Sequence, residues 1–182
     1  MNTAPRLASG RPLPGEYADY AQADIERVAG DDAVAALVQL TEGTLALLAP
    51  LADDAVAGVA YAPGKWTLKQ VVGHLVDDER IFAYRALAVA RGESAELPGF
   101  DETIYAAAAG HEARRMASLC AEYRAVRGAT LALFAGLPAE AWTRRGRVNG
   151  YSATVRGLAF HIAGHELRHV AALREKYLPL VR

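Results

Sequence analysis

Several features that define whole classes of protein are nearly absent from the 182-residue sequence. Its single cysteine, Cys120, excludes an intramolecular disulfide framework and a zinc site built from cysteines, so we expect a cytoplasmic protein. With 20 Lys and Arg against 21 Asp and Glu, the formal net charge is -1, and there is no basic field to attract a nucleic-acid backbone. We therefore expect no nucleic-acid partner.

Long hydrophobic runs are also scarce. The beginning of the chain lacks the apolar centre of a signal peptide. The apolar run from Thr44 to Leu51 is shorter than the roughly 18 residues that span a bilayer, and Pro50 interrupts it. We expect neither secretion nor a membrane partner.

Proline-rich residues 1–14 predict a flexible tail, and residues 15–182 have the length of a single domain.

Apolar residues recur at helical spacing in four segments with helix start and stop signals at their ends. Thr67 and Gln70 form a capping-box pattern at the start of the second segment, and Ser152 is the expected cap of the last. No segment alternates like a strand, and residues 143–150 read as a polar loop. We predict an all-α four-helix bundle with short accessory helices near residues 16–29 and 101–109. The four long helices are expected over residues 31–48, 67–91, 113–134 and 152–177.

A stripe of histidines on the last helix is the strongest chemical signal. His161, His165 and His169 follow one another at four-residue spacing, which places their rings over one helix face. Two imidazoles one turn apart can chelate a divalent ion, and a third ligand must then come from elsewhere. His74 is the natural third ligand, because it lies among apolar residues of the second long helix.

The alternative for His74 is a core histidine with a backbone hydrogen-bond partner, which is the commoner situation for a lone histidine. Burying three or four imidazoles in one core without a metal would require several separate polar partners, so the set favours metal binding. Helical spacing alone does not decide which two of the three histidines on the last helix bind the ion.

His165 to His169 also matches the H-E-x-x-H pattern of zinc metallopeptidases, in which the glutamate acts as general base. Glu166 is the candidate base by this analogy, although it lies about 100° around the helix from His165. The further downstream ligand usual in such peptidases is missing, and a metallopeptidase is the weakest of the functions we consider.

Other polar residues have a structural and a functional interpretation. Asp78 lies one turn beyond His74 and can orient an imidazole or lie near the ion, but residues 77–80 can equally form a solvated charged face. We expect Cys120 to be a small core residue and His111 to be a surface residue.

Four motifs together resemble the DinB-like superfamily, which includes the YfiT type of metal-dependent protein. They are Tyr61-Ala62-Pro63-Gly64-Lys65-Trp66-Thr67, the run from Gly73 to Arg85, Leu97-Pro98-Gly99-Phe100-Asp101, and the run from Ala163 to His169. The resemblance implies a four-helix bundle that holds nickel or zinc through His74, His165 and His169. It makes His161 a neighbour of the ion and not a ligand. Many relatives carry two adjacent histidines where this chain has Arg168 and His169.

The resemblance also implies a function on small molecules. Its characterised members include S-transferases that use low-molecular-weight thiols such as bacillithiol, and a mycothiol-dependent maleylpyruvate isomerase. We therefore expect a metal-dependent thiol S-transferase or hydrolase with an open three-histidine site, a small-molecule substrate, possible use of a thiol cosubstrate, and a homodimer. The alternative is a structural or stress-response module in which the ion only fastens two helices.

Overall fold

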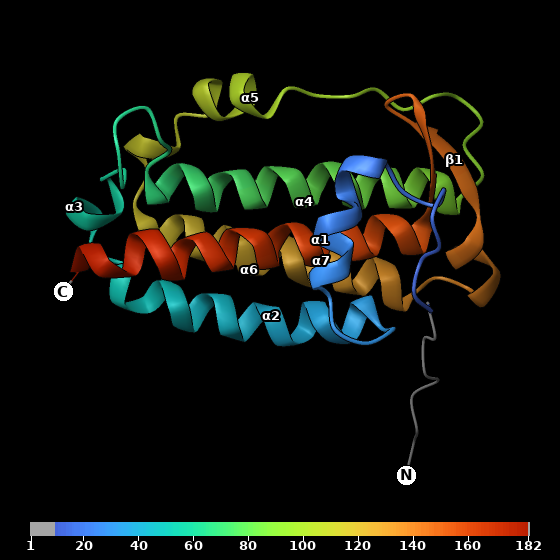
Figure 1. Ribbon diagram of the computed structural model, residues 1–182, viewed down its shortest axis with the longest axis horizontal. Helices are drawn as coiled ribbons and strands as arrows, with labels where there is room; N and C mark the ends of the chain where they lie inside the picture. Colours follow the sequence, from blue (N-terminus) through green and yellow to red (C-terminus); the bar gives the residue numbers. More distant parts are fainter. Residues whose placement is uncertain (1–9, 182) are drawn as a thin grey trace, which may run out of the picture.

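In the computed structural model, the described residues are 10–181. Four long helices run along the long axis of the molecule (Figure 1). They are α2 (Ala33–Leu48), α4 (Leu68–Ala90), α6 (Met116–Ala135) and α7 (Val155–Ala172). Within the bundle α4 packs against α6 and α7, and α2 packs against the same two helices on the other side. The predicted all-α four-helix bundle is confirmed, as are the positions of its long helices.

Shorter elements connect and cover the bundle. The accessory helices α1 (Gln22–Arg27) and α5 (Glu102–Ala108) lie in the two segments where short helices were expected, and α3 (Asp54–Ala57) is an additional single turn. A π-helical turn, Leu173–Tyr177, continues α7. The 3-10 turns are Asp19–Ala21, Ala49–Leu51, His111–Ala113, Ala139–Thr143 and Leu178–Val181.

The helix starts follow local hydrogen-bonding chemistry. Thr67 and Gln70 form the complete capping box at α4, because each side chain pairs with the backbone of the other residue. The cap of α7 is Thr154, whose hydroxyl accepts from Gly157 N at 3.1 Å. The prediction of Ser152 as this cap was wrong by two residues, because Ser152 lies in a strand.

A β-hairpin replaces the predicted polar loop. Strands β1 (Arg145–Val148) and β2 (Tyr151–Thr154) pair antiparallel, with Val148 opposite Tyr151. Asn149 and Gly150 form the turn with φ of 48° and 85°. Positive φ at both central residues matches the twist of a hairpin, which is why Asn-Gly is favoured there. This dipeptide was the sequence signal for the hairpin.

The segment before the bundle is attached to it. The predicted flexible tail falls partly on residues 1–9, which lie outside the described residues. From residue 10 the chain differs from that prediction, because the Arg11 guanidinium donates to the backbone oxygens of Ile25, Val28 and Gly30 at 2.7–2.8 Å. Just beyond, α1 crosses the face of α7 (Figure 1). The approach is so close that a Cβ on Gly164 would lie 2.1 Å from the backbone oxygen of Asp24.

Among the described residues, one stretch, Ala33–Leu51, is long and apolar enough to cross a membrane, judged by length and composition alone. The prediction of no membrane span considered only the shorter run from Thr44, so it underestimated this length. In the structure α2 packs lengthwise on α6 and α7 and buries Leu37, Thr44 and Leu48. Core helices of bundles share this length and composition, so the stretch is weak evidence for a membrane span.

A buried cluster of charges joins all four long helices. Arg127 of α6 is 1% exposed and forms a two-bond ion pair with Glu79 of α4, at 2.9 and 2.8 Å. It also pairs with Glu166 of α7 and donates to the backbone oxygen of Leu37 in α2 at 3.0 Å. Glu79 is thus buried in the core, and the idea that residues 77–80 form a solvated face is wrong for this residue and for the equally buried Asp78.

Candidate metal centre

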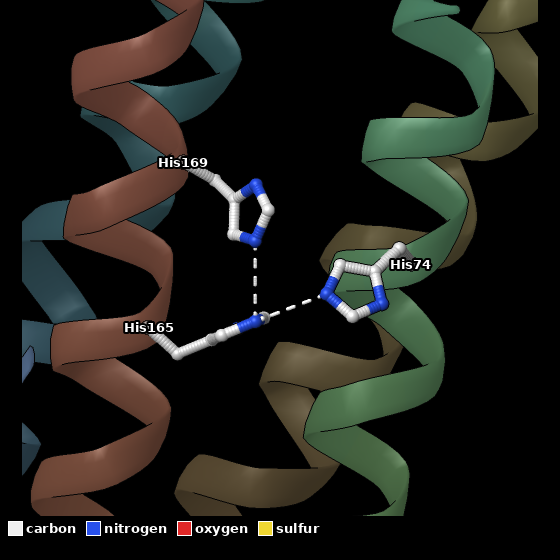
Figure 2. A group of neighbouring side chains, drawn as sticks. All are labelled: His74, His165 and His169. Atoms are coloured by element: carbon white, nitrogen blue, oxygen red, sulfur yellow. Dashed lines mark hydrogen bonds between the residues drawn. The ribbon is translucent and has the colours of Figure 1, made fainter. Parts of the chain in front are cut away.

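Three imidazoles from two helices converge inside the bundle. Figure 2 shows His74 of α4 facing His165 and His169 of α7. His165 Nε2 lies 3.0 Å from His74 Nε2 and 3.2 Å from His169 Nε2. The four-residue spacing on α7 presents two rings to one side, and the packing of α4 on α7 supplies the third. The structure therefore brings together the three residues that were predicted as ligands.

Burial keeps these rings neutral. It lowers the pKa of His74 to about 4 and that of His169 to about 3, and the pKa of His165 well below its usual value. The Arg168 guanidinium nearby acts in the same direction on all three rings. An imidazole must be neutral to donate its lone pair to a metal, so the site holds its histidines in the state that binds one.

Asp78 orients the central ring. Its Oδ2 lies 3.3 Å from His165 Nδ1, and both side chains are buried. In its ionised form Asp78 favours a proton on Nδ1 of His165, which leaves the lone pair of Nε2 directed at the other two rings, whereas in its protonated form it can itself donate to Nδ1. The predicted role of Asp78 beside an imidazole matches this placement. Burial raises the pKa of Asp78 itself to about 8.

The donor set fits a divalent metal ion. One ring nitrogen from each histidine lies within 4.8 Å of those of the other two. The separations of 3.0 and 3.2 Å between His165 Nε2 and its two neighbours are close to the about 3.4 Å expected for two nitrogens that share a tetrahedral zinc ion at about 2.1 Å. Imidazole nitrogens are ligands for zinc, nickel, copper and iron, so the donors alone do not select among these metals. His74, His165 and His169 are the residues that would hold the ion.

His161 is outside this group. Its ring stacks on Phe82 with centroids 3.9 Å apart and an angle of 18° between the planes. It also lies parallel to the His165 ring at 5.8 Å. The fourth histidine of the predicted set therefore packs beside the centre, which agrees with the role of a neighbour that the resemblance implied.

Glu166 does not face the histidines. It is 2% exposed, and its carboxylate accepts from Thr44 at 2.5 Å and Tyr123 at 2.6 Å and pairs with Arg127. A general base must be within hydrogen-bond reach of the proton that it removes, and these donors already occupy the carboxylate. The 100° rotation from His165 turns Glu166 into the core, so it is not a candidate base and the metallopeptidase analogy fails.

Sequence reasoning missed one carboxylate at the centre and misplaced one histidine. Glu102 of α5 places its Oε2 3.8 Å from His74 Nε2, with its side chain 56% exposed. Nothing in its local sequence indicates this position, because the connection carrying it folds back along α4. His111 was expected on the surface, but it is 5% exposed and its Nε2 lies 3.2 Å from Asp77 Oδ2.

Two cavities reach the histidines. The larger, which we call the arginine cavity, has a volume of about 470 Å³ and includes His165, Asp78 and Glu102 in its wall. The smaller, which we call the aromatic cavity, has a volume of about 230 Å³ and is lined by His169. Arg27, Arg85 and Arg168 line the first cavity, and Tyr61, Trp66 and Tyr177 line the second. Small molecules can therefore reach the centre by two routes.

Fold and site together define a class of protein: an all-α bundle that gathers three histidines from two long helices beside a cavity. A family model described as the DinB superfamily matches residues 36–173, and the chain belongs to that superfamily. The match includes all three histidines, and it confirms the family that the sequence motifs indicated.

A solved structure supports the same fold. The chain is similar to YfiT from Bacillus subtilis, with a TM-score of 0.69 and 19% sequence identity over 94% of this chain and 92% of that one. That protein is described as a probable metal-dependent hydrolase with an unusual four-helix bundle topology. At this identity the likeness shows the fold alone. No curated protein matches the sequence.

Proposed function

We propose that this protein is a metal-dependent enzyme that directs a small nucleophile, water or a low-molecular-weight thiol, at a small-molecule electrophile. The observation that carries the proposal is the convergence of three neutral imidazoles, of which His165 lines the arginine cavity and His169 lines the aromatic cavity. A divalent ion held by three imidazoles supplies Lewis acidity and lowers the pKa of a water or thiol at its open position. Zinc and nickel are the metals that we propose.

The number of ligands favours catalysis over a purely structural role. Closed structural zinc sites normally have four protein ligands. Within residues 10–181, the group of metal-binding side chains contains three. Asp78 and His161 do not complete a closed shell, because Asp78 faces the far nitrogen of His165 and His161 stacks on Phe82. Glu102 lies 3.8 Å from His74 Nε2, but it is 56% exposed and outside that group.

The residues around the centre have separate tasks in this proposal. Asp78 fixes the orientation and tautomer of His165. Glu102 lies beside His74 on the side open to solvent, where its carboxylate can accept a proton from the nucleophile. Trp66 packs on the His74 ring at 4.8 Å and forms part of the wall of the aromatic cavity.

The presence of two cavities supports a reaction between two molecules. A hydrolase needs room for one organic substrate and water, whereas a thiol S-transferase needs room for two organic partners. The arginine cavity suits a charged partner, and the aromatic cavity suits an apolar one. We therefore place thiol S-transfer first and hydrolysis second.

Metal analysis and a paired activity screen test the proposal. Protein purified without a nickel column should contain a stoichiometric divalent metal, and His169→Ala should lose it while His161→Ala keeps it. The metal-loaded protein is then assayed with aryl halides and aryl esters, each with water alone and with bacillithiol, mycothiol or cysteine. Thiol-dependent turnover that His169→Ala abolishes is the expected result. Equal turnover by wild type and His169→Ala would contradict a role for the centre in catalysis.

A further inference from the structure

Arg85 is a buried cation without a carboxylate partner. It lies on α4, is 3% exposed, and donates one hydrogen bond from Nη2 to the backbone oxygen of Pro98 at 2.7 Å. Among the described residues, no carboxylate oxygen lies within 4.0 Å of its guanidinium. A charge taken out of water without a counter-ion is unfavourable, so a buried arginine left in this state needs an explanation.

The guanidinium of Arg85 lies close to two aromatic rings. Its central carbon lies 4.7 Å from the centroid of Phe82 and 5.6 Å from that of Phe100. A guanidinium placed over an aromatic ring keeps the N–H groups at its edge for hydrogen bonding. Arg85 is also part of the wall of the arginine cavity, so this rigid group borders the same space as His165.

The other charged groups of the arginine cavity are already engaged. Asp24 pairs with Arg168 at 3.1 Å and with Arg27 at 3.7 Å. The remaining two carboxylates, Asp78 and Glu102, face the imidazoles of the metal centre. Asp78 is close enough to feel the charge of Arg85, but it contacts His165 and not the guanidinium. No carboxylate of the cavity wall therefore contacts Arg85 directly, and an anionic group of a bound molecule can do so.

We propose that Arg85 is the anchor of a subsite for the carboxylate of an elongated small molecule whose other end reaches the histidines. This subsite deepens the proposed function, on which its link to the reacting end of the molecule rests. A planar carboxylate matches the edge of a fixed guanidinium and can accept two parallel hydrogen bonds from it. Arg85 follows His74 by about three helical turns, roughly 16 Å of backbone rise, and its guanidinium reaches back over Phe82, whose ring stacks on His161. The molecule therefore carries its carboxylate separated from its reacting group.

Binding of hexanoate, compared with its neutral analogue hexanamide, tests the subsite without requiring turnover. Titrations use the full chain, both loaded with zinc and treated with chelator, and are followed by calorimetry and by the NMR signal of the arginine Nε–H groups. We expect hexanoate to bind both forms, to shift the Arg85 signal, and to bind roughly ten- to hundredfold more tightly than hexanamide.

Substitutions on the same helix provide matched controls. Arg85→Met should remove the preference for hexanoate, and Arg85→Lys should retain only part of it, because an ammonium cannot form the paired contact. Arg91→Met, at an exposed arginine at the end of α4, should leave it unchanged. If Arg85→Met does not fold, the loss of preference in Arg85→Lys and the wild-type NMR shift still decide the question.

Several results would overturn the subsite. The proposal fails if hexanoate and hexanamide bind wild type equally, or if neither binds. Hexanoate binding that requires zinc and persists in Arg85→Met would show that the carboxylate binds the ion and not Arg85. Tighter binding of inorganic phosphate than of hexanoate would overturn the carboxylate assignment. Failure of the proposed enzyme activity appears separately, as the absence of turnover in protein that still prefers hexanoate.

Discussion

Replacing Arg127 by methionine should destabilise the bundle severely. The substitution keeps an unbranched side chain of similar length but removes the only cation in contact with Glu79 and Glu166 in the described part of the chain. Both carboxylates are at most 3% exposed, so water cannot replace the guanidinium without opening the core. The contact with the backbone oxygen of Leu37 is lost as well.

The size of the effect follows from the burial of the pair. Removing one partner of a buried ion pair lowers the free energy of unfolding by about 3–5 kcal/mol, since it leaves an uncompensated charge. For a chain of this length each kcal/mol lowers the melting temperature by about 2–4 °C. A fall in melting temperature of about 6–20 °C is therefore expected. Arg124→Met on the same helix removes an exposed pair with Glu42 and should change the free energy by no more than about 1 kcal/mol.

Urea unfolding followed by circular dichroism measures both variants, and two further results identify the cause. Adding Glu79→Gln and Glu166→Gln to Arg127→Met should restore part of the stability, because no buried charge remains. A buried carboxylate without a counter-ion is unfavourable only while it is charged, so protonation relieves the single variant. The deficit against wild type should thus be smaller at pH 5 than at pH 8. A loss below about 1 kcal/mol, or no recovery in the triple variant, would refute the reasoning.

Further predictions concern the metal centre and the packing around it. Chelation should lower the melting temperature, because an ion that binds only the folded chain stabilises it; identical melting curves for protein shown to contain metal would contradict this. In metal-free protein, burial lowers the pKa of His161 to about 3 and that of His74 to about 4. These groups stabilise the fold above the unfolded pKa of about 6.5, and that contribution should be lost as pH falls toward 4, as acid titration of unfolding would show. His74→Ala and His165→Ala should each abolish metal retention in metal analysis, whereas His161→Ala should weaken affinity by roughly 10- to 100-fold. Gly164→Ala should displace α1 from α7 and lower the melting temperature, since its Cβ would lie 2.1 Å from a backbone oxygen.

The sequence predicts the long helices well because their signals are local. The capping box at Thr67 and the four-residue spacing of His165 and His169 depend on residues one turn apart, and the structure keeps both. The Asn149-Gly150 turn was also a local signal, but the strands beside it are short and polar and lack clear alternation.

Features that depend on tertiary packing were not available from the sequence. The direction of Glu166 is set by how α7 is rotated against α6, and this rotation decides whether the residue faces Arg127 or the ion. The position of Glu102 depends on the path of a connection that returns along α4. Neither path nor rotation has a signature in neighbouring residues, because both result from contacts between segments far apart in the chain.

The placement of His165 and Glu166 at successive positions of α7 has a consequence for how this superfamily member can diverge. The side chain of His165 faces the candidate metal centre, and that of Glu166 joins the buried charge cluster that connects all four long helices. The three histidines that would hold an ion come from only two helices, whereas the arginine cluster connects four. Descendants can therefore replace a histidine, bind another metal or lose the proposed reaction and still fold as a four-helix bundle. A substitution at Arg127 would instead destabilise the bundle and with it any activity that depends on the fold.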